Sequence, residues 1–203
     1  MKNNLIKILG DVTISLGKGT LWRPCKSQKI NENLSVIVSK GMVNLYVFKY
    51  KDVVICSDAG NYNDSRLQEE FSKLGIDHHD VTHLLLTHVD PDHAGSLDYQ
   101  DRYHHFPNAK ILAGKTELEV LNKRIPRLTS GSIKLYNPLE IHRNIDILGD
   151  AQEFNIGSVK VEMFVTTGHS PGHMSFVLNN EILLTGDSML LDNKMNRLPF
   201  YAP

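Results

Sequence analysis

Four side chains that can bind a metal ion crowd into six positions of the segment Thr82–Leu97, which reads THLLLTHVDPDHAGSL. They are His88, Asp90, Asp92 and His93. Neutral imidazoles and carboxylates suit divalent ions such as zinc, iron or manganese. Alternate residues of an extended segment point the same way, so His88, Asp90 and Asp92 can converge on one ion. The alternative is a polar loop that caps a helix, because Asp-Pro-Asp is also common in turns and N-caps.

Two later segments repeat the arrangement of a strand followed by metal-competent side chains. A Gly- and Pro-containing loop carries His169 and His173 after the strand-like run Val159–Val165. The apolar run Ile182–Leu184 leads to Asp187. Because ligands bind outside the ends of strands in such sheets, three occurrences in one chain predict a site assembled along one rim of a sheet sandwich.

These three motifs resemble those of the metallo-β-lactamase superfamily. Its first motif is His-x-His-x-Asp-His, followed by a lone His in a Gly-His loop, a bridging Asp after Thr-Gly, and a distal His. The matching residues are His88, Asp92 and His93 in the first motif, His169 as the lone His, and Asp187 as the bridging Asp. The resemblance covers roughly residues 33–187. It implies an α/β fold, an αββα sandwich of the metallo-β-lactamase type, formed by a single domain over residues 1–203 with residues 1–30 as a poorly determined lead-in.

The resemblance also implies two divalent metal ions, with zinc favoured and iron or manganese as alternatives. The expected ligands form two sets: His88, Asp90 and His169 for the first ion, Asp92 and His93 for the second, and Asp187 between them. Asp58, at the end of an early strand, is expected to accept a hydrogen bond from a metal-bound imidazole. His173 is expected to support the ligands or contact substrate, and the alternative is a loop histidine in water.

The sequence departs from the family pattern at two places. Asp90 replaces the second histidine of the first motif, and a carboxylate there shifts the metal preference from zinc toward iron or manganese. The flavodiiron branch also has a carboxylate at this place, but this chain has no room for a flavodoxin domain. No residue after Asp187 is histidine, so the chain looks C-terminally short and without the distal ligand. We therefore expect a truncated form, or a second site that is weak, water-filled or completed by a neighbouring subunit.

Composition limits the classes of protein. The 203 residues have a net charge of −1 and a sequence pI near 6.8, which argues against nucleic-acid binding. The N-terminal apolar run is interrupted by Lys7 and Asp11 and is too short to span a membrane. Cys25 and Cys56 form no zinc or disulfide motif, and a cytoplasmic location fits best. Six histidines lie outside the motifs and are expected to be structural or solvated: His78, His79, His83, His104, His105 and His142.

The elements that must position the site follow from the apolar pattern. The runs Leu34–Val38, Val43–Phe48 and Val53–Cys56 predict an antiparallel meander. Helices are expected over Asn63–Leu74, Ala94–Tyr99 with Asp92 as its N-cap, and Thr116–Leu121 with Glu117 in its first turn. Buried strands are expected at Leu84–Leu86 and Lys110–Ala113. A second sheet is expected from four segments: Ile145–Ile156, Val159–Val165, Met174–Leu178 and Ile182–Thr185. The unpatterned region 124–144 is expected to line or cover the substrate pocket.

Three functions are consistent with these residues. The first is a hydrolase in which a metal-bound hydroxide attacks a small ester, lactone or thioester, with Asp92 accepting a proton from the attacking water. The other two are a redox protein with non-haem iron, motivated by Asp90, and a catalytically silent binding module of the same fold. The loop and Thr-Gly-Asp motifs look like the glyoxalase II and lactonase branches, although Leu190 stands where lactonases carry tyrosine. A small molecule is the expected substrate, and a homodimer is one way to cover apolar surface that a missing tail would expose.

Overall fold

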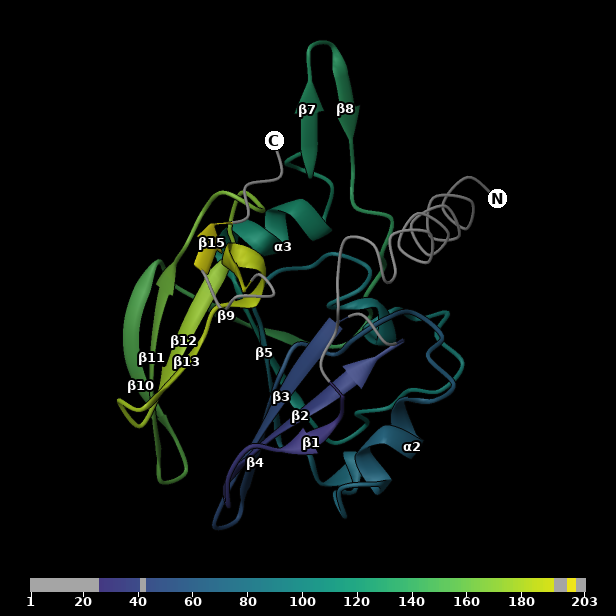
Figure 1. Ribbon diagram of the computed structural model, residues 1–203. Coiled ribbons are helices and arrows are strands. Elements are labelled where there is room, and N and C mark those ends of the chain that lie inside the picture. Colours follow the sequence, from purple (N-terminus) through teal and green to yellow (C-terminus); the bar gives the residue numbers. More distant parts are fainter. Residues whose placement is uncertain (1–25, 41–42, 192–196, 200–203) are drawn as a thin grey trace.

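The computed structural model describes residues 26–40, 43–191 and 197–199, and its largest element is a seven-stranded sheet (Figure 1). The strands follow the order β1, β2, β3, β4, β5, β6, β9. Their bounds are β1 Gln28–Lys29, β2 Leu34–Ser39, β3 Val43–Tyr50, β4 Val53–Ser57, β5 His83–Leu86, β6 Lys110–Gly114 and β9 Ile145–Leu148. Strands β1 to β4 pair antiparallel, which confirms the predicted meander, whereas β4, β5, β6 and β9 pair parallel.

A second sheet of four antiparallel strands packs against the first (Figure 1). Its strands are β10 Ala151–Ile156, β11 Val159–Val165, β12 Met174–Leu178 and β13 Ile182–Leu184. The prediction for Ile145–Ile156 is wrong in its first part, because β9 pairs parallel with β6 in the first sheet. A parallel neighbour requires a long crossover. The segment between β6 and β9 is long enough because it contains a helix and a hairpin.

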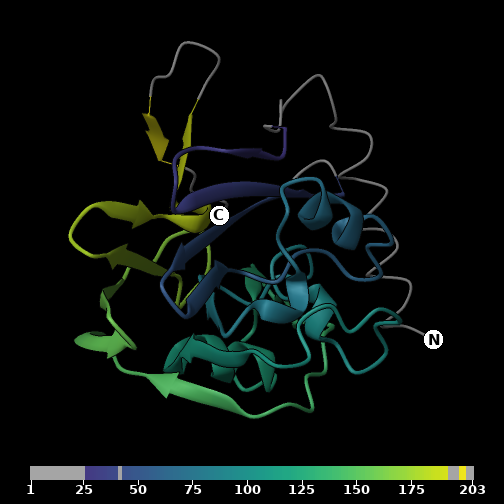
Figure 2. The same cartoon turned by 90° about the horizontal axis from the view of Figure 1, so that it is seen from below.

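Two short helices pack on the face of the first sheet that points away from the second sheet. Figures 1 and 2 place α2 (Leu67–Ser72), in blue, on the side away from the yellow-green strands. Helix α3 (Lys115–Leu121) follows β6, as predicted for Thr116–Leu121. The remaining elements are η1 His78–Asp80, η2 Gly95–Leu97, η3 Gly186–Ser188, and the hairpins β7 Leu128–Ser130 with β8 Ile133–Leu135 and β14 Met189–Leu191 with β15 Arg197–Pro199.

The first sheet contributes to two apolar cores because its side chains alternate between its faces. On β5, Leu84 and Leu86 join the cluster under the helices, where they meet Leu67 and Phe71 of α2. Leu85 joins the cluster between the sheets. All three leucines are fully buried, as expected for a parallel strand covered on both faces. The strand is therefore fixed firmly, and so is the position where its metal-competent loop begins.

The helix predicted over Ala94–Tyr99 is wrong, and only the three-residue 3-10 helix η2 forms there. This segment is bonded to the loop after β4. Gly95 packs so closely on that loop that a Cβ atom would lie 2.3 Å from the backbone nitrogen of Tyr62. The Ser96 hydroxyl donates to the Ala59 carbonyl at 2.7 Å. These contacts take the place of a helical bonding pattern, and Asp92 is not an N-cap.

The helix predicted over Asn63–Leu74 is shorter than expected, since α2 covers only Leu67–Ser72. The predicted stop at Gly75 is confirmed by its positive φ of 69°, which glycine adopts without strain.

Candidate metal centre

Three loops at one end of the sandwich carry the predicted ligands. His88, Asp90, Asp92 and His93 follow β5 in the first sheet. The loop between β11 and β12 carries His169, and η3 after β13 carries Asp187, so the other two loops belong to the second sheet. The rim predicted from the sequence is therefore formed by both sheets.

The predicted ligands lie within contact distance of one another. The Oδ2 atom of Asp90 lies 3.5 Å from His88 Nε2 and 3.4 Å from His169 Nε2. The Oδ1 atom of Asp187 lies 3.3 Å from His93 Nε2, and its Oδ2 atom lies 3.6 Å from His169 Nε2. Donor atoms of His88, His169 and Asp187 all lie within 4.8 Å of one another. The structure thus brings ligands from three loops into one cluster.

Asp92 lies at the edge of this cluster. Its Oδ2 atom is 3.9 Å from His93 Nε2, and a quarter of its side chain is exposed. Burial raises the pKa of its carboxyl, and the neighbouring carboxylates of Asp90 and Asp187 add to this effect against the opposing influence of His93. Asp92 is therefore the member of the cluster best suited to exchange a proton.

Asp58 determines which nitrogen atoms of two imidazoles face the centre. Its carboxylate accepts hydrogen bonds from the Thr87 backbone N–H (2.7 Å), the Thr87 hydroxyl (2.9 Å) and His93 Nδ1 (3.0 Å). Because the Thr87 hydroxyl donates to Asp58, it accepts from His88 Nδ1, 3.0 Å away. Both imidazoles thus carry a proton on Nδ1, and their Nε2 atoms point into the cluster. This is the support that the sequence predicts for Asp58.

The cluster fits a bound cation. His88 Nε2 and His93 Nε2 are buried, and neither has a hydrogen-bond partner among the described residues. Buried polar atoms are rarely left unpaired, so these two Nε2 atoms indicate a ligand. Burial alone would lower the pKa of His93, but Asp187, Asp58 and Asp92 raise it well above its ordinary value. Carboxylates that attract a proton this strongly also attract a divalent ion.

His173 is buried and supports Asp187. Burial, together with the neighbouring histidines, lowers the pKa of His173 to about 2, so its ring is neutral. Its Nε2 atom accepts the backbone N–H of Asp187 at 3.1 Å, and Nδ1 donates to the Thr166 hydroxyl at 2.8 Å. The alternative of a solvated loop histidine is wrong. Gly186 allows this contact, because a Cβ atom there would lie 2.7 Å from His173 Nε2.

Arg127 was not predicted from the sequence, but its guanidinium lies inside the cluster. Its Nε and Nη2 atoms bind the two carboxylate oxygens of Asp90 at 2.5 and 2.6 Å. Nη2 is also 3.2 Å from His169 Nε2. Burial alone would raise the pKa of Asp90, but His88, His169 and Arg127 hold it well below its ordinary value. Arg127 directly precedes β7 in the unpatterned region, so no local motif distinguishes it from the nearby exposed Arg124.

Glu117 is the second functional residue that sequence reasoning missed, because its place in the first turn of α3 predicted only a helix-dipole role. The side chain is fully buried. Its Oε2 atom accepts the Val89 backbone N–H at 2.9 Å. Its Oε1 atom accepts the Ser170 hydroxyl at 2.6 Å and the Gly172 backbone N–H at 2.9 Å. One carboxylate thus joins the ligand loop of the first sheet to a ligand loop of the second.

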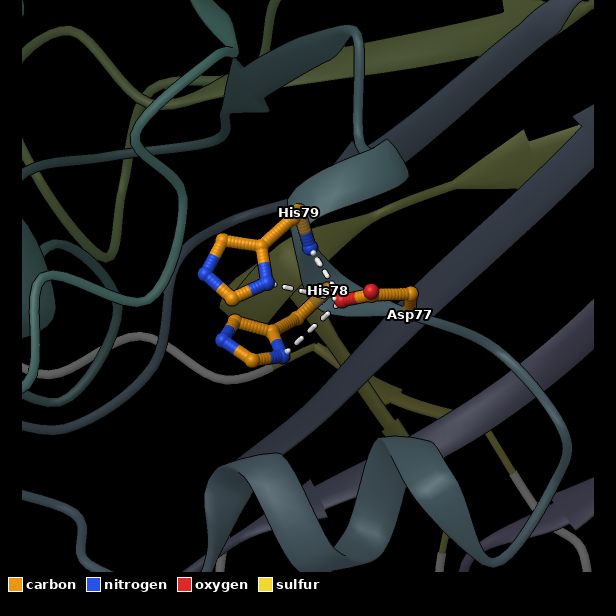
Figure 3. Close-up of side chains that lie close together, drawn as sticks. All are labelled: Asp77, His78 and His79. Carbon is orange, nitrogen blue, oxygen red and sulfur yellow. Dashed lines mark hydrogen bonds and ion pairs between the residues drawn. The ribbon is translucent and has the colours of Figure 1, made fainter.

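A separate group of metal-competent side chains is formed by Asp77, the N-cap of η1, and by His78 and His79 within η1 (Figure 3). Because η1 precedes β5, this group lies before the strand whose far end carries the candidate centre. The Asp77 carboxylate accepts from the backbone N–H of His79 and faces Nδ1 of both rings, at 3.5 Å for His78 and 2.9 Å for His79. This is the bonding of an Asp N-cap. His78 is buried and His79 exposed, as expected for structural or solvated histidines.

The chain belongs to the metallo-beta-lactamase superfamily, whose family profile matches residues 38–197. A solved structure, the metallo-beta-lactamase MIM-1 of Novosphingobium pentaromativorans, superposes with a TM-score of 0.61 at 23% identity, covering 90% of this chain and 64% of that one. The αββα sandwich fold predicted from the sequence is confirmed. Within the described residues, α2 and α3 form the helical layer on the first sheet.

Two curated relatives have hydrolase names. An atrochrysone carboxyl ACP thioesterase of Pseudocercospora fijiensis is 26% identical over 164 residues, 79% of this chain and 41% of that protein. An N-acyl homoserine lactonase of Bacillus thuringiensis is 27% identical over 142 residues, 68% of this chain and 50% of that protein. The chain thus spans half or less of each relative. None of the helices in the described residues is long and apolar enough to cross a membrane.

Proposed function

We propose that this chain is a metal-dependent hydrolase that acts on a small ester, lactone or thioester. The observation that carries the proposal is the pair of buried Nε2 atoms of His88 and His93, which lack hydrogen-bond partners among the described residues and lie beside carboxylates. Zinc is the favoured ion because most of the donors are imidazoles. When bound, a divalent ion supplies a water of lowered pKa and polarises a carbonyl oxygen.

The side chains of this chain then have distinct tasks. His88, His93 and Asp187 would hold the ion, and Asp58 keeps the Nε2 atoms of His88 and His93 directed at it. Asp92 accepts a proton from the attacking water and returns it to the leaving group. The raised pKa of Asp92 suits this exchange. The pKa of Asp187 suits it less, because His93, His88 and His169 hold it far below its ordinary value although burial acts to raise it.

The substrate class is supported by the relatives and by the hairpin β7–β8. The names of the two relatives concern a thioester and a lactone, which share an acyl carbonyl. The hairpin begins beside Arg127 and extends away from the body of the molecule (Figure 1). It and the residue that follows carry exposed apolar side chains, at Ile133, Leu135 and Tyr136. An acyl group of the substrate finds apolar contacts there, in the region expected to line the pocket.

The redox alternative loses its main support. The carboxylate at Asp90 motivates this alternative, but both oxygens of Asp90 are bonded to Arg127.

The test is to purify the chain, measure its metal content, and assay an ester, a lactone, a thioester and a phosphodiester. We expect zinc and turnover of an acyl substrate, loss of turnover in Asp187→Asn, and wild-type turnover in His104→Asn, which changes an exposed histidine. Stoichiometric iron with a redox-active spectrum would favour the redox protein. Full zinc loading without turnover of any substrate would favour the binding module.

A further inference from the structure

We propose that the guanidinium of Arg127 takes the place of the second cation, so that this chain binds one divalent ion where the sequence motifs imply two. The inference rests on the proposed function in one respect, since it requires that the centre bind an ion. The inference differs from the proposed function because it assigns half of the expected metal ligands to the guanidinium of Arg127.

The geometry of Arg127 is that of a strong and specific ion pair. Its two bonds to Asp90, at 2.5 and 2.6 Å, form the parallel fork in which a guanidinium matches a carboxylate. Both side chains are largely buried, with exposed fractions of 17% for Arg127 and 15% for Asp90. Arg127 remains charged at any ordinary pH, so it provides a permanent positive charge in the cluster.

An ion in the first expected position would compete with Arg127 for the same atoms. Such an ion would be held by His88, Asp90 and His169, at about 2.0–2.2 Å from each donor atom. However, Nη2 of Arg127 already lies 2.6 Å from Asp90 Oδ2 and 3.2 Å from His169 Nε2. His169 Nε2 has one lone pair, which a guanidinium N–H and a metal ion cannot use at the same time. Each oxygen of Asp90 already accepts a charged N–H, so Arg127 disfavours an ion bound to Asp90 and His169.

The single ion is then expected in the other half of the cluster, which is formed by His88, His93 and Asp187. Among the described residues, Arg127 forms hydrogen bonds only with Asp90 and His169. His93 Nε2 and Asp187 Oδ1 are 3.3 Å apart, which is close to the ~3.3 Å between two donors of a tetrahedral ion with bonds of about 2.0–2.1 Å. His88 Nε2 is a further buried nitrogen of this half of the cluster, and it has no hydrogen-bond partner among the described residues.

Zinc stoichiometry tests the proposal. The chain is saturated with zinc, dialysed against metal-free buffer and analysed for zinc per chain. We expect one zinc in the wild type and a twofold rise, to two, in Arg127→Gln, because glutamine removes the charge and frees Asp90 and His169. Arg124→Gln is the matched control, since Arg124 lies three residues earlier and pairs with Glu119 at the surface. It should keep one zinc.

The outcomes separate this inference from the proposed function. Two zinc ions in the wild type, or no increase in Arg127→Gln, would overturn the inference and leave a metal-dependent hydrolase. A wild type that binds no zinc would overturn both.

A second measurement uses the wild type and does not depend on the folding of Arg127→Gln. In protein labelled with ¹⁵N, the Nε–H group of Arg127 gives its own resonance, assigned by its absence from Arg127→Lys or by its displacement in Asp90→Asn. We expect this resonance to persist unchanged in position when zinc is added to saturation, because the ion pair with Asp90 survives. Its disappearance or a large shift at saturation would show that zinc displaces Arg127, and would overturn the proposal.

Discussion

The Asp58 carboxylate orients two of the proposed ligands, His93 directly and His88 through the Thr87 hydroxyl. In Asp58→Asn the amide nitrogen is a hydrogen-bond donor that faces other donors, those of Thr87 and His93. The tautomers of the His88 and His93 imidazoles are then no longer fixed. We expect zinc affinity to fall by about 10–100-fold, the usual effect of removing such support. Competition with a chromophoric chelator measures the affinity.

Asp77→Asn is the control for this prediction, because Asp77 also faces a histidine Nδ1, at 2.9 Å, but lies near the other end of β5. Equal losses of affinity in the two variants would contradict the assigned role of Asp58.

Local motifs account for the residues that could be predicted. His88, Asp92 and His93 lie in one short segment, and His169 and Asp187 each follow a strand-like run, so type and spacing identified them. Arg127 reaches Asp90 across 37 positions of sequence. Its role depends on how the chain returns after α3, which no local pattern encodes. The six side chains of the cluster could therefore be named in advance, whereas the guanidinium that binds Asp90 and contacts His169 could not.

Helix α3 fixes the two ligand loops through Glu117, and the consequence is testable. In Glu117→Gln the amide oxygen can replace one carboxylate oxygen, but the amide NH₂ then faces the N–H of Val89 or of Gly172. Leaving a buried donor unpaired costs about 1–3 kcal/mol. We expect the free energy of unfolding to fall by this amount in urea titrations and zinc affinity to fall with it. Glu119→Gln, a change to the surface ion pair of the same helix, should alter stability by less than about 1 kcal/mol.

The positions of the strands are easier to predict from the sequence than the strands with which they pair in the sheets. The run Leu84–Leu86 is apolar and lies between polar residues, and β5 forms there. Strand β9 was assigned to the wrong sheet because its sequence does not encode its partner: Ile147 is 65% exposed, as an edge strand allows. The helix expected at Ala94–Tyr99 failed because Gly95 and Ser96 bind a distant loop. Tertiary contacts decided both cases.

The molecule as a whole should lose stability in mild acid through histidines away from the metal centre. Burial lowers the pKa of His105, against the opposing influence of the Asp64 carbonyl, Asp101 and Asp64. Burial together with His79 and His105 lowers the pKa of His78. The unfolded chain then binds more protons than the folded one below pH 6.5, so stability is full above that pH and falls as the pH decreases toward the folded-state pKa values.

His105→Gln isolates this effect, because the glutamine amide can still donate to the Asp64 carbonyl that Nε2 binds at 2.8 Å. We expect the loss of unfolding free energy between pH 7 and pH 5 to be smaller in this variant than in the wild type. His104→Asn, a change at the exposed neighbouring histidine, should leave the loss unchanged. A loss that is the same in His105→Gln and the wild type would contradict the prediction.

The candidate metal centre also lies where the two sheets meet, since His88 and His93 follow β5 of the first sheet and His169 and Asp187 follow strands of the second. An ion bound across this junction stabilises the folded chain by RT ln(1 + [L]/Kd), about 2.7 kcal/mol when free zinc is 100 times Kd. We expect the melting temperature to rise with zinc concentration and to fall after chelation, by calorimetry. In Asp187→Asn the concentration dependence should weaken strongly, because the variant loses the carboxylate that faces His93 and His169. A wild-type melting temperature that does not respond to zinc would show that no ion joins the sheets.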